Sequence, residues 1–214
     1  MNIELYYAPN TCALVPYVTL SEAGAVFTVH PLNFRKKQQM SPQYLAINPK
    51  HKVPLLVIDG ATLSENPAMA IWIARNFPAA RLLPEDPWLM AQAISLHSWC
   101  AASIHPHLSR INSASKYCDA PGSEASIKAL AQKMIEADFA IADKMLQGRE
   151  FLFDHFTSAD VHLFWCLRRA SQLGIDITPF GNCQAFFERM LERPSVKKVY
   201  AFEKQVQAEF AQSA

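Results

Sequence analysis

The sequence predicts an α/β domain followed by an all-helical domain. Over residues 1–78, short apolar segments of strand length alternate with segments whose apolar residues recur at helical spacing. Three prolines between Phe77 and Trp88 end this alternation, and every later pattern is helical. Alternating strands and helices are typical of α/β domains. We therefore expect an α/β domain over residues 1–78, a linker over 79–88 and a helical domain over 89–214.

The first domain shows four strand patterns and three helix patterns. The strands are expected at residues 3–7, 26–32, 55–58 and 61–63, and the helices at residues 13–23, 41–46 and 66–76. Asp59 and Gly60 form a hairpin turn signal between the last two strands. Ser41 and Asn66 are expected to cap the two helices that begin with the prolines after them. The order βαβ followed by ββα is that of a thioredoxin-like domain.

The second domain shows helical patterns at residues 88–115, 123–146, 158–173, 182–191 and 194–210. Pro106 removes a backbone hydrogen bond within the first of these helices and is expected to kink it. Thr157 and Asp160 have the spacing of a capping box, in which two side chains satisfy backbone N–H groups at a helix start. These patterns predict an all-α domain.

The composition indicates a folded globular protein. Of the 214 residues, 50% are hydrophobic and 18% are charged, and the formal net charge is +1. Because a long cationic surface is missing, nucleic acid is not an expected partner, and the basic run at residues 35–37 is expected in a solvated loop. No apolar run reaches the length of a membrane span, so no membrane partner is expected. The five cysteines are scattered and odd in number, which indicates a reducing compartment and a cytoplasmic location.

The segment over residues 48–67 carries the strongest functional signal. Pro54 has no backbone N–H and belongs at the first position of a strand. If the Val53–Pro54 bond is cis, Val53 turns its own N–H and C=O outward, as a template for the backbone of another peptide. The Glu65 carboxylate suits an ammonium, and the helix N-terminus at Asn66 suits a carboxylate. A small peptide with a zwitterionic end fits these groups.

Cys12 follows the first expected strand and stands just before the helix at residues 13–23. A thiol at a helix N-terminus experiences the positive end of the helix dipole, so we expect its pKa to lie below the ordinary value of about 8.5. The segment lacks the second cysteine of a Cys-x-x-Cys pair, which disfavours a dithiol oxidoreductase. A single thiol can still form a mixed disulfide.

These two motifs, together with the segment from Tyr6 to Pro16, resemble the glutathione-binding half of soluble glutathione S-transferases. The cysteine after the first strand resembles the bacterial beta class of that family. The resemblance implies the glutathione transferase fold, in which an α/β thioredoxin-like domain precedes an all-α domain. It also implies glutathione as co-substrate, a small hydrophobic electrophile as second substrate, and a homodimer.

The resemblance implies a set of glutathione-binding residues, which are Lys36, Lys52, Val53, Pro54, Glu65 and Asn66. Val53 and Pro54 would hold the cysteinyl backbone, and Glu65 would pair with the γ-glutamyl ammonium. The Asn66 backbone N–H would receive the γ-glutamyl carboxylate, although the family usually has serine at this position. The two lysines would meet the glycyl carboxylate.

Three residues compete for the role of activating the glutathione sulfur, namely Tyr7, Thr11 and Cys12. His105 resembles a histidine that faces the sulfur in beta-class enzymes. The helix that carries His105 spreads it and the nearby His97, Cys100 and His107 over more than one face, so no metal site is expected.

Three functions follow from these observations. The first is conjugation of the glutathione thiolate to hydrophobic electrophiles. The second is glutathione-dependent thiol transfer or disulfide reduction, in which Cys12 itself attacks a disulfide. The third is a non-catalytic binding module that keeps the fold, which Asn66 and Phe153 leave open, because the family usually has serine and glycine at these two positions.

Overall fold

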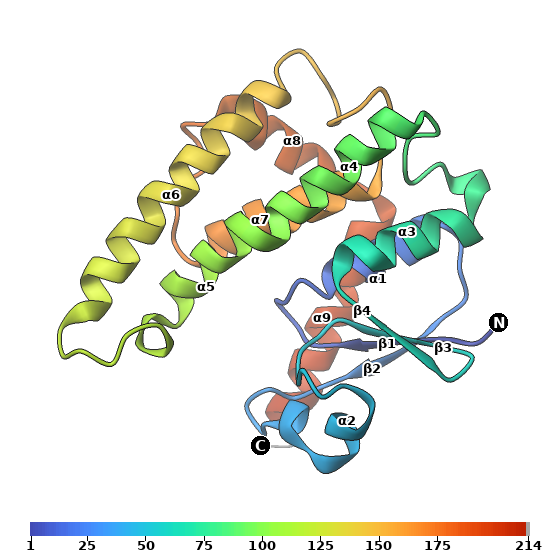
Figure 1. The fold of residues 1–214 in the computed structure, drawn as a ribbon, viewed down its shortest axis with the longest axis horizontal. Helices are drawn as coiled ribbons and strands as arrows, with labels where there is room; N and C mark the ends of the chain where they lie inside the picture. The colour runs from blue at the N-terminus through green and yellow to red at the C-terminus, as the bar shows by residue number, and fades with distance from the viewer. Residues whose placement is uncertain (213–214) are drawn as a thin grey trace. The chain divides into compact units, whose positions relative to one another are not determined.

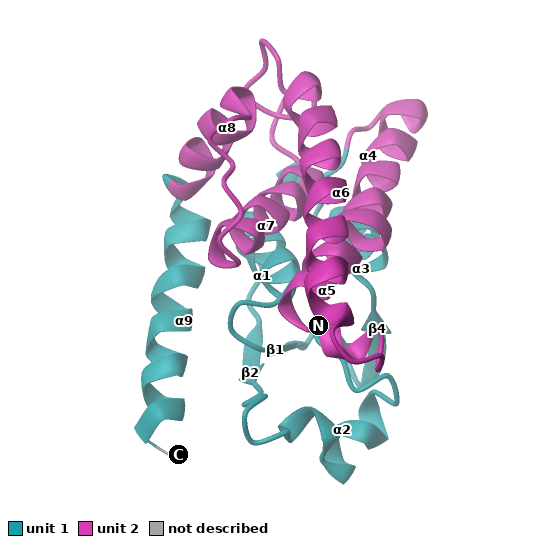
Figure 2. Cartoon of the chain, turned by 90° about the vertical axis from the view of Figure 1, so that its left-hand side faces the viewer, with its two compact units in different colours: residues 1–83, 192–214 teal, residues 84–191 magenta. Residues whose placement is uncertain are grey.

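The computed structural model describes residues 1–212, and the chain divides into two compact units (Figure 2). Unit 1 contains residues 1–83 and the C-terminal segment that begins at Glu192, and unit 2 contains residues 84–191. The first division falls inside the expected linker at residues 79–88. The C-terminal segment, however, belongs to unit 1 rather than to the helical part of the chain.

Unit 1 is built on a four-stranded sheet with the strand order β2-β1-β3-β4. The strands are β1 (Ile3–Tyr7), β2 (Thr28–Pro31), β3 (Leu55–Ile58) and β4 (Ala61–Ser64). Strand β1 pairs in parallel with β2 and antiparallel with β3, and β3 pairs antiparallel with β4. The parallel pair needs a crossover connection, whereas the antiparallel pair closes through a tight hairpin. The expected thioredoxin-like architecture is confirmed.

The helices of unit 1 are α1 (Leu14–Glu22), α2 (Pro42–Ile47), α3 (Asn66–Asn76) and α9 (Pro194–Gln212). Helices α1 and α3 lie side by side on one face of the sheet, and α2 lies on the other side (Figure 1). The β1 side chains alternate in burial, with Ile3, Leu5 and Tyr7 fully buried. This alternation follows from the two-residue period of a strand.

Helix α9 joins unit 1 through specific contacts with α1. The Arg193 guanidinium donates to both Glu22 carboxylate oxygens, with N–O distances of 3.0 and 2.8 Å, and the Ser195 hydroxyl donates to the same carboxylate. The Tyr17 and Phe202 rings stack with centroids 5.3 Å apart. These long-range contacts explain why the last helix does not group with the preceding helices.

Unit 2 is entirely helical, as the sequence predicts. Its helices are α4 (Pro87–Trp99), α5 (His105–Asn112), α6 (Ser123–Met145), α7 (Ser158–Gln172) and α8 (Gly181–Leu191). Helices α4 and α5 are joined by a π-helical segment, Cys100–Ile104, where a single kinked helix was expected. The His105 N–H donates to the Cys100 carbonyl five residues earlier. The wider turn lies directly before Pro106, the residue that cannot donate to the α-helical ladder.

Helix α7 begins with the expected capping box. The Asp160 Oδ2 accepts from the Thr157 N–H at 2.7 Å, and its Oδ1 accepts from the Leu152 N–H at 2.8 Å. Burial raises the pKa of the Asp160 carboxyl to about 6, although these hydrogen bonds act in the opposite direction. Among residues 1–212, no helix is both long and apolar enough to cross a membrane.

Candidate active site

The turn that enters β3 has the peptide-bond geometry on which the predicted peptide template depends. The Val53–Pro54 bond is cis. The Val53 carbonyl oxygen lies 3.8 Å from Cys12 Sγ, which makes it an acceptor for the thiol. Across the part of the chain that the structure describes, no hydrogen bond uses the Val53 N–H. A bound peptide can therefore take up this donor.

Two buried side chains hold this turn in place. The Lys52 carbonyl accepts from the Tyr44 hydroxyl at 2.5 Å and from Asn48 Nδ2 at 2.7 Å. Asn48 Oδ1 accepts from the Lys50 N–H at 3.1 Å, and the His51 N–H donates to the Asn48 carbonyl. His51 adopts a φ of 46°, which a non-glycine residue rarely does. Neither Tyr44 nor Asn48 was predicted to have this role, although Asn48 is the first residue of the motif.

Cys12 lies between β1 and α1, and its side chain is buried. Helix α1 begins at Leu14, so Cys12 stands two residues before it. Burial raises the pKa of the Cys12 thiol to about 12, despite opposing contributions from a backbone amide and the Asn66 side chain. The expected lowering of this pKa by the helix dipole is wrong, because desolvation of the thiolate outweighs the favourable hydrogen bonds.

Asn66 connects α3 to the Cys12 segment. It is the first residue of α3, and Glu65 occupies the cap position. The Asn66 Nδ2 donates to the Cys12 carbonyl at 3.2 Å, and its Oδ1 is buried without a hydrogen-bond partner in the described chain. The expected capping role of the Asn66 side chain is therefore wrong, because the amide is committed to the neighbouring loop.

Glu65 presents an exposed carboxylate at the end of β4. Its backbone has a φ of 75° and a ψ of 124°, a conformation that typically costs about 1–3 kcal/mol and clusters at functional sites. Its side chain makes no capping hydrogen bond and lies 2.8 Å from Lys50 Nζ. Ordinary helix capping does not account for this residue.

Tyr7 is fully buried and points toward α9. Its hydroxyl donates to Glu203 Oε1, which also accepts from the Asn10 N–H at 2.9 Å. Asn10 has a φ of 64°, so Glu203 fixes an unusual backbone conformation two residues before Cys12. Because the Tyr7 proton is engaged by Glu203, the geometry disfavours Tyr7 as the group that activates the sulfur. Glu203 was not predicted to be part of this site.

Thr11 also engages its hydroxyl locally. The Oγ1 donates to the Ala8 carbonyl at 2.7 Å and accepts from the Ala13 N–H at 3.3 Å. The side chain is only half-buried, so rotation about χ1 is sufficient to redirect the hydroxyl. Thr11 and Cys12 thus remain the two candidates for the activating residue.

Three further residues were predicted for the site, namely Lys36, Lys52 and His105. Lys36 is exposed in a loop where Asn33 Oδ1 accepts its N–H at 3.3 Å, and Lys52 presents its side chain to solvent. His105 belongs to unit 2, where its ring lies edge-on to Trp165 with centroids 4.5 Å apart. A position of His105 opposite the sulfur stays a prediction. Residues 1–212 contain no group of three or more His, Cys, Asp or Glu side chains arranged to hold a metal ion.

Two family models match the chain. Residues 1–75 match the glutathione S-transferase N-terminal domain, and residues 108–202 match the glutathione S-transferase C-terminal domain. A glutathione S-transferase of Xanthomonas campestris pv. campestris is 30% identical over 199 residues, which cover 91% of this chain and 96% of the relative. The chain belongs to the glutathione S-transferase family. The expected resemblance is confirmed.

Solved structures of the family share the whole fold. A bacterial beta class glutathione S-transferase of Sphingomonas chungbukensis is 31% identical, with a TM-score of 0.82 over 94% of this chain and 98% of that one. A sphingomonad glutathione S-transferase complexed with glutathione is 29% identical, with the same TM-score and the same coverage. The beta-class resemblance seen at Cys12 is thus matched by likeness to beta-class structures across both units.

Proposed function

We propose that this transferase binds glutathione and conjugates its thiolate to small hydrophobic electrophiles. The observation that carries the proposal is the Val53 main chain, whose N–H is available to a ligand and whose C=O faces the Cys12 thiol. A peptide that pairs with Val53 places its cysteinyl sulfur near Thr11 and Cys12. The complex of the sphingomonad relative with glutathione supports this choice of peptide.

The rest of the ligand follows from the start of α3. The γ-glutamyl carboxylate would accept from the Asn66 backbone N–H, because the first N–H groups of a helix have no intrahelical partner. The γ-glutamyl ammonium would pair with Glu65, whose carboxylate is exposed. Lys52 and Lys36 would meet the glycyl carboxylate, since both present their side chains to solvent.

Conjugation needs a glutathione thiolate beside the electrophile. The thiol loses its proton to solvent, and the sulfur lone pair attacks the electrophilic carbon, while a halide leaves if the substrate is an aryl halide. A hydroxyl that donates to the sulfur favours the thiolate and so lowers the pKa of bound glutathione. Thr11 supplies such a hydroxyl once it turns from the Ala8 carbonyl.

The second candidate function is thiol transfer by Cys12. The Cys12 thiolate would attack a glutathione disulfide, forming a Cys12–glutathione disulfide while glutathione thiolate leaves. The proximity of Cys12 Sγ to the Val53 carbonyl favours this candidate, because it places both sulfurs in one region. The raised pKa of Cys12 opposes it, since little thiolate is present near neutral pH.

Two substitutions separate these functions. Thr11→Ala is expected to lower the rate of conjugation to 1-chloro-2,4-dinitrobenzene by about 100-fold, the effect typical of losing one donor to a developing anion. Cys12→Ala is expected to keep most of this activity and to abolish reduction of a glutathione disulfide. Initial rates for both reactions measure the effect. If Cys12→Ala loses conjugation activity and Thr11→Ala keeps it, Cys12 is the residue that activates the sulfur.

We further propose a homodimer in the cytoplasm. Helix α6 presents a row of large apolar side chains, each at least 40% exposed, at Leu130, Met134, Ile141 and Met145. Seven residues make about two helical turns, and this spacing lines the side chains up along one side of α6, where they can contact another helix. In a two-fold homodimer, the second copy presents the same row.

The proposed location depends on the cysteines. None of the five cysteines is in a disulfide, which is consistent with a reducing compartment.

A further inference from the structure

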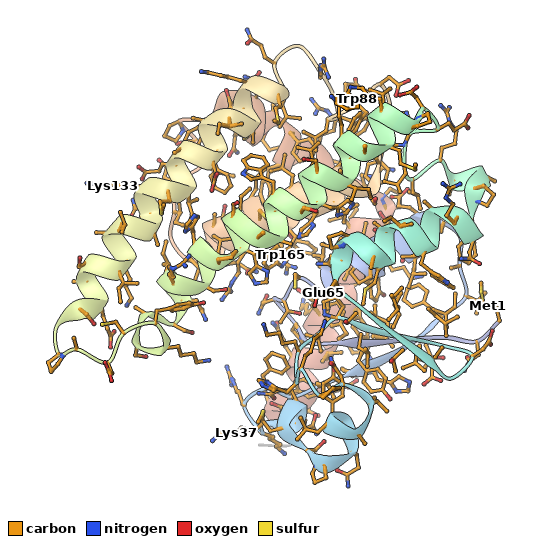
Figure 3. The ribbon with its side chains drawn as sticks, in the orientation of Figure 1. Met1, Lys37, Glu65, Trp88, Lys133 and Trp165 are labelled. Atoms are coloured by element: carbon orange, nitrogen blue, oxygen red, sulfur yellow. The ribbon has the colours of Figure 1, made fainter. Side chains whose placement is uncertain are left out.

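Lys50 places a primary ammonium where the proposed function requires the ammonium of the ligand. The Lys50 Nζ lies 2.8 Å from Glu65 Oε1 and 3.0 Å from Ser64 Oγ. Both acceptors lie where β4 leads into α3, at the position labelled Glu65 in Figure 3. An ammonium group can donate three hydrogen bonds, and these two oxygens can accept two of them from a protonated primary amine.

The backbone that carries Lys50 is held in place. The buried Asn48 accepts the Lys50 N–H through Oδ1 at 3.1 Å and donates through Nδ2 to the Lys52 carbonyl at 2.7 Å. The turn that precedes Val53 therefore also orients the Lys50 side chain. The motif that forms the candidate peptide-binding turn thus places the Lys50 side chain within reach of Glu65.

The contact is one that a ligand can displace. The Lys50 and Glu65 side chains are 53% and 64% exposed. Exposed ion pairs are weak, because water and salt screen them and because two long side chains lose rotamer freedom. Lys50 thus competes for Glu65 without closing the site.

We propose that Lys50 is an intramolecular competitor of glutathione, whose ammonium occupies the amine position formed by Ser64 and Glu65 until the γ-glutamyl amine displaces it. This inference rests on the proposed function. It assigns Ser64 Oγ as a second acceptor for the ligand amine. It follows that Lys50 weakens the affinity for peptides that carry this amine and leaves the affinity for peptides without it unchanged.

The test compares two variants and two ligands. Lys50→Met removes the ammonium and keeps much of the apolar stem, and Lys198→Met removes the same charge from an exposed position of unit 1 on α9. The ligands are S-methylglutathione, whose sulfur cannot form a disulfide with Cys12, and its analogue with hydrogen in place of the γ-glutamyl amine. Calorimetric titration at low ionic strength gives the four dissociation constants and those of the unmodified protein.

Lys50→Met is expected to bind S-methylglutathione about two- to fivefold more tightly than the unmodified protein, which corresponds to about 0.4–1 kcal/mol. Its affinity for the analogue without the amine is expected to equal that of the unmodified protein. Any change in affinity that Lys198→Met also shows is attributed to the loss of one positive charge. The gain is expected to shrink at high salt, because the competing ion pair is screened. Circular dichroism verifies that each variant is folded.

Equal or weaker binding of S-methylglutathione by Lys50→Met would overturn the inference. It would mean that Lys50 is no competitor, or that it holds Glu65 ready for the ligand. The proposed function would stand in that case, because the unmodified protein still binds the peptide. Absence of binding of both ligands by the unmodified protein would instead overturn the proposed function.

Discussion

Glu203 is a carboxylate at a position where α9 otherwise buries apolar side chains. The buried row of the helix runs through Val196, Val199, Glu203 and Val206. An acid in such a row is a signal that sequence patterns can show, because a buried carboxylate requires donors. Its donors here are the Tyr7 hydroxyl and the Asn10 N–H, which belong to the loop before Cys12. Glu203 therefore helps to hold the conformation of the candidate catalytic loop.

This role of Glu203 makes a prediction about Tyr7. Tyr7→Phe is expected to lower the free energy of unfolding by about 1 kcal/mol, because one hydrogen bond is lost. Its conjugation rate is expected to change by less than about tenfold, whereas loss of a group that acts on the sulfur would cost about 100-fold or more. Urea unfolding and initial rates with an aryl halide measure the two effects.

Glu203→Leu is the matched comparison. It removes the carboxylate that accepts from the buried Tyr7 hydroxyl and from the half-buried Asn10 N–H, so we expect a loss of about 2–4 kcal/mol in the free energy of unfolding together with a fall in kcat/KM. A rate loss of 100-fold in Tyr7→Phe, with little change in stability, would show that Tyr7 acts on the sulfur after all.

At the scale of elements, α4 and α7 are joined by a pair of buried histidines. The Nδ1 atoms of His97 and His162 lie 3.0 Å apart, and His97 Nε2 lies 2.9 Å from Ser158 Oγ. Only one proton fits between the two Nδ1 atoms, so the accepting ring must be neutral and the two rings cannot both be protonated in this contact. Burial lowers the pKa of His97 to about 4, and burial with the nearby His97 and His105 lowers the pKa of His162.

The histidine pair predicts a loss of stability in acid. Between pH 6.5 and about 4, the unfolded chain binds protons at these histidines and the folded chain does not, so the free energy of unfolding falls as the pH falls. His162→Asn is expected to reduce this slope by up to about 1.4 kcal/mol per pH unit. Thermal or urea unfolding at several pH values measures the slope.

Comparing the pH dependence of stability in His162→Asn with that in the unmodified protein isolates the contribution of the histidine pair. The raised pKa of Asp160 acts in the opposite direction, since a carboxyl protonated in the folded state adds stability below pH 6 that is lost as the pH rises. Asp160 is the same in both proteins and cancels in the difference. An unchanged slope in His162→Asn would contradict the assignment.

Local sequence patterns were sufficient to predict most helices and strands, but not which of them pack against one another. The hairpin at Asp59 and Gly60 and the capping box of α7 depend on neighbouring residues, and both are present. The association of α9 with α1 depends on Arg193 and Glu22, which are far apart in the sequence. The pKa of Cys12 was mispredicted for a similar reason, because burial is a property of the folded chain.

The candidate site was predictable where a motif spans it. Val53, Glu65 and Asn66 belong to one continuous segment, and the structure brings this segment to Cys12 through the contacts of Val53 and Asn66. The partner of Glu65 was not predicted, because Lys50 reaches it only after the turn and hairpin have formed. The choice among the three predicted functions depends on the positions of individual atoms, which sequence patterns do not determine.

At the scale of the whole molecule, the apolar row of α6 predicts self-association. Ile141→Glu places a charge in the middle of the row and is expected to shift the protein from dimer to monomer, because a charge is costly to bury without a partner. Ala129→Glu adds the same charge to an exposed position outside the row and serves as control. Light scattering after size-exclusion chromatography measures the mass. A dimer that persists in Ile141→Glu would exclude this row as the interface.

We propose above that the Val53 main chain and the start of α3 hold the peptide part of glutathione. A crystal structure of the protein with S-methylglutathione is the decisive experiment. We predict that the cysteinyl backbone lies within hydrogen-bond distance of the Val53 N–H and C=O, with the γ-glutamyl amine at Glu65. A peptide bound away from Val53, with its amine remote from Glu65, would contradict the claim.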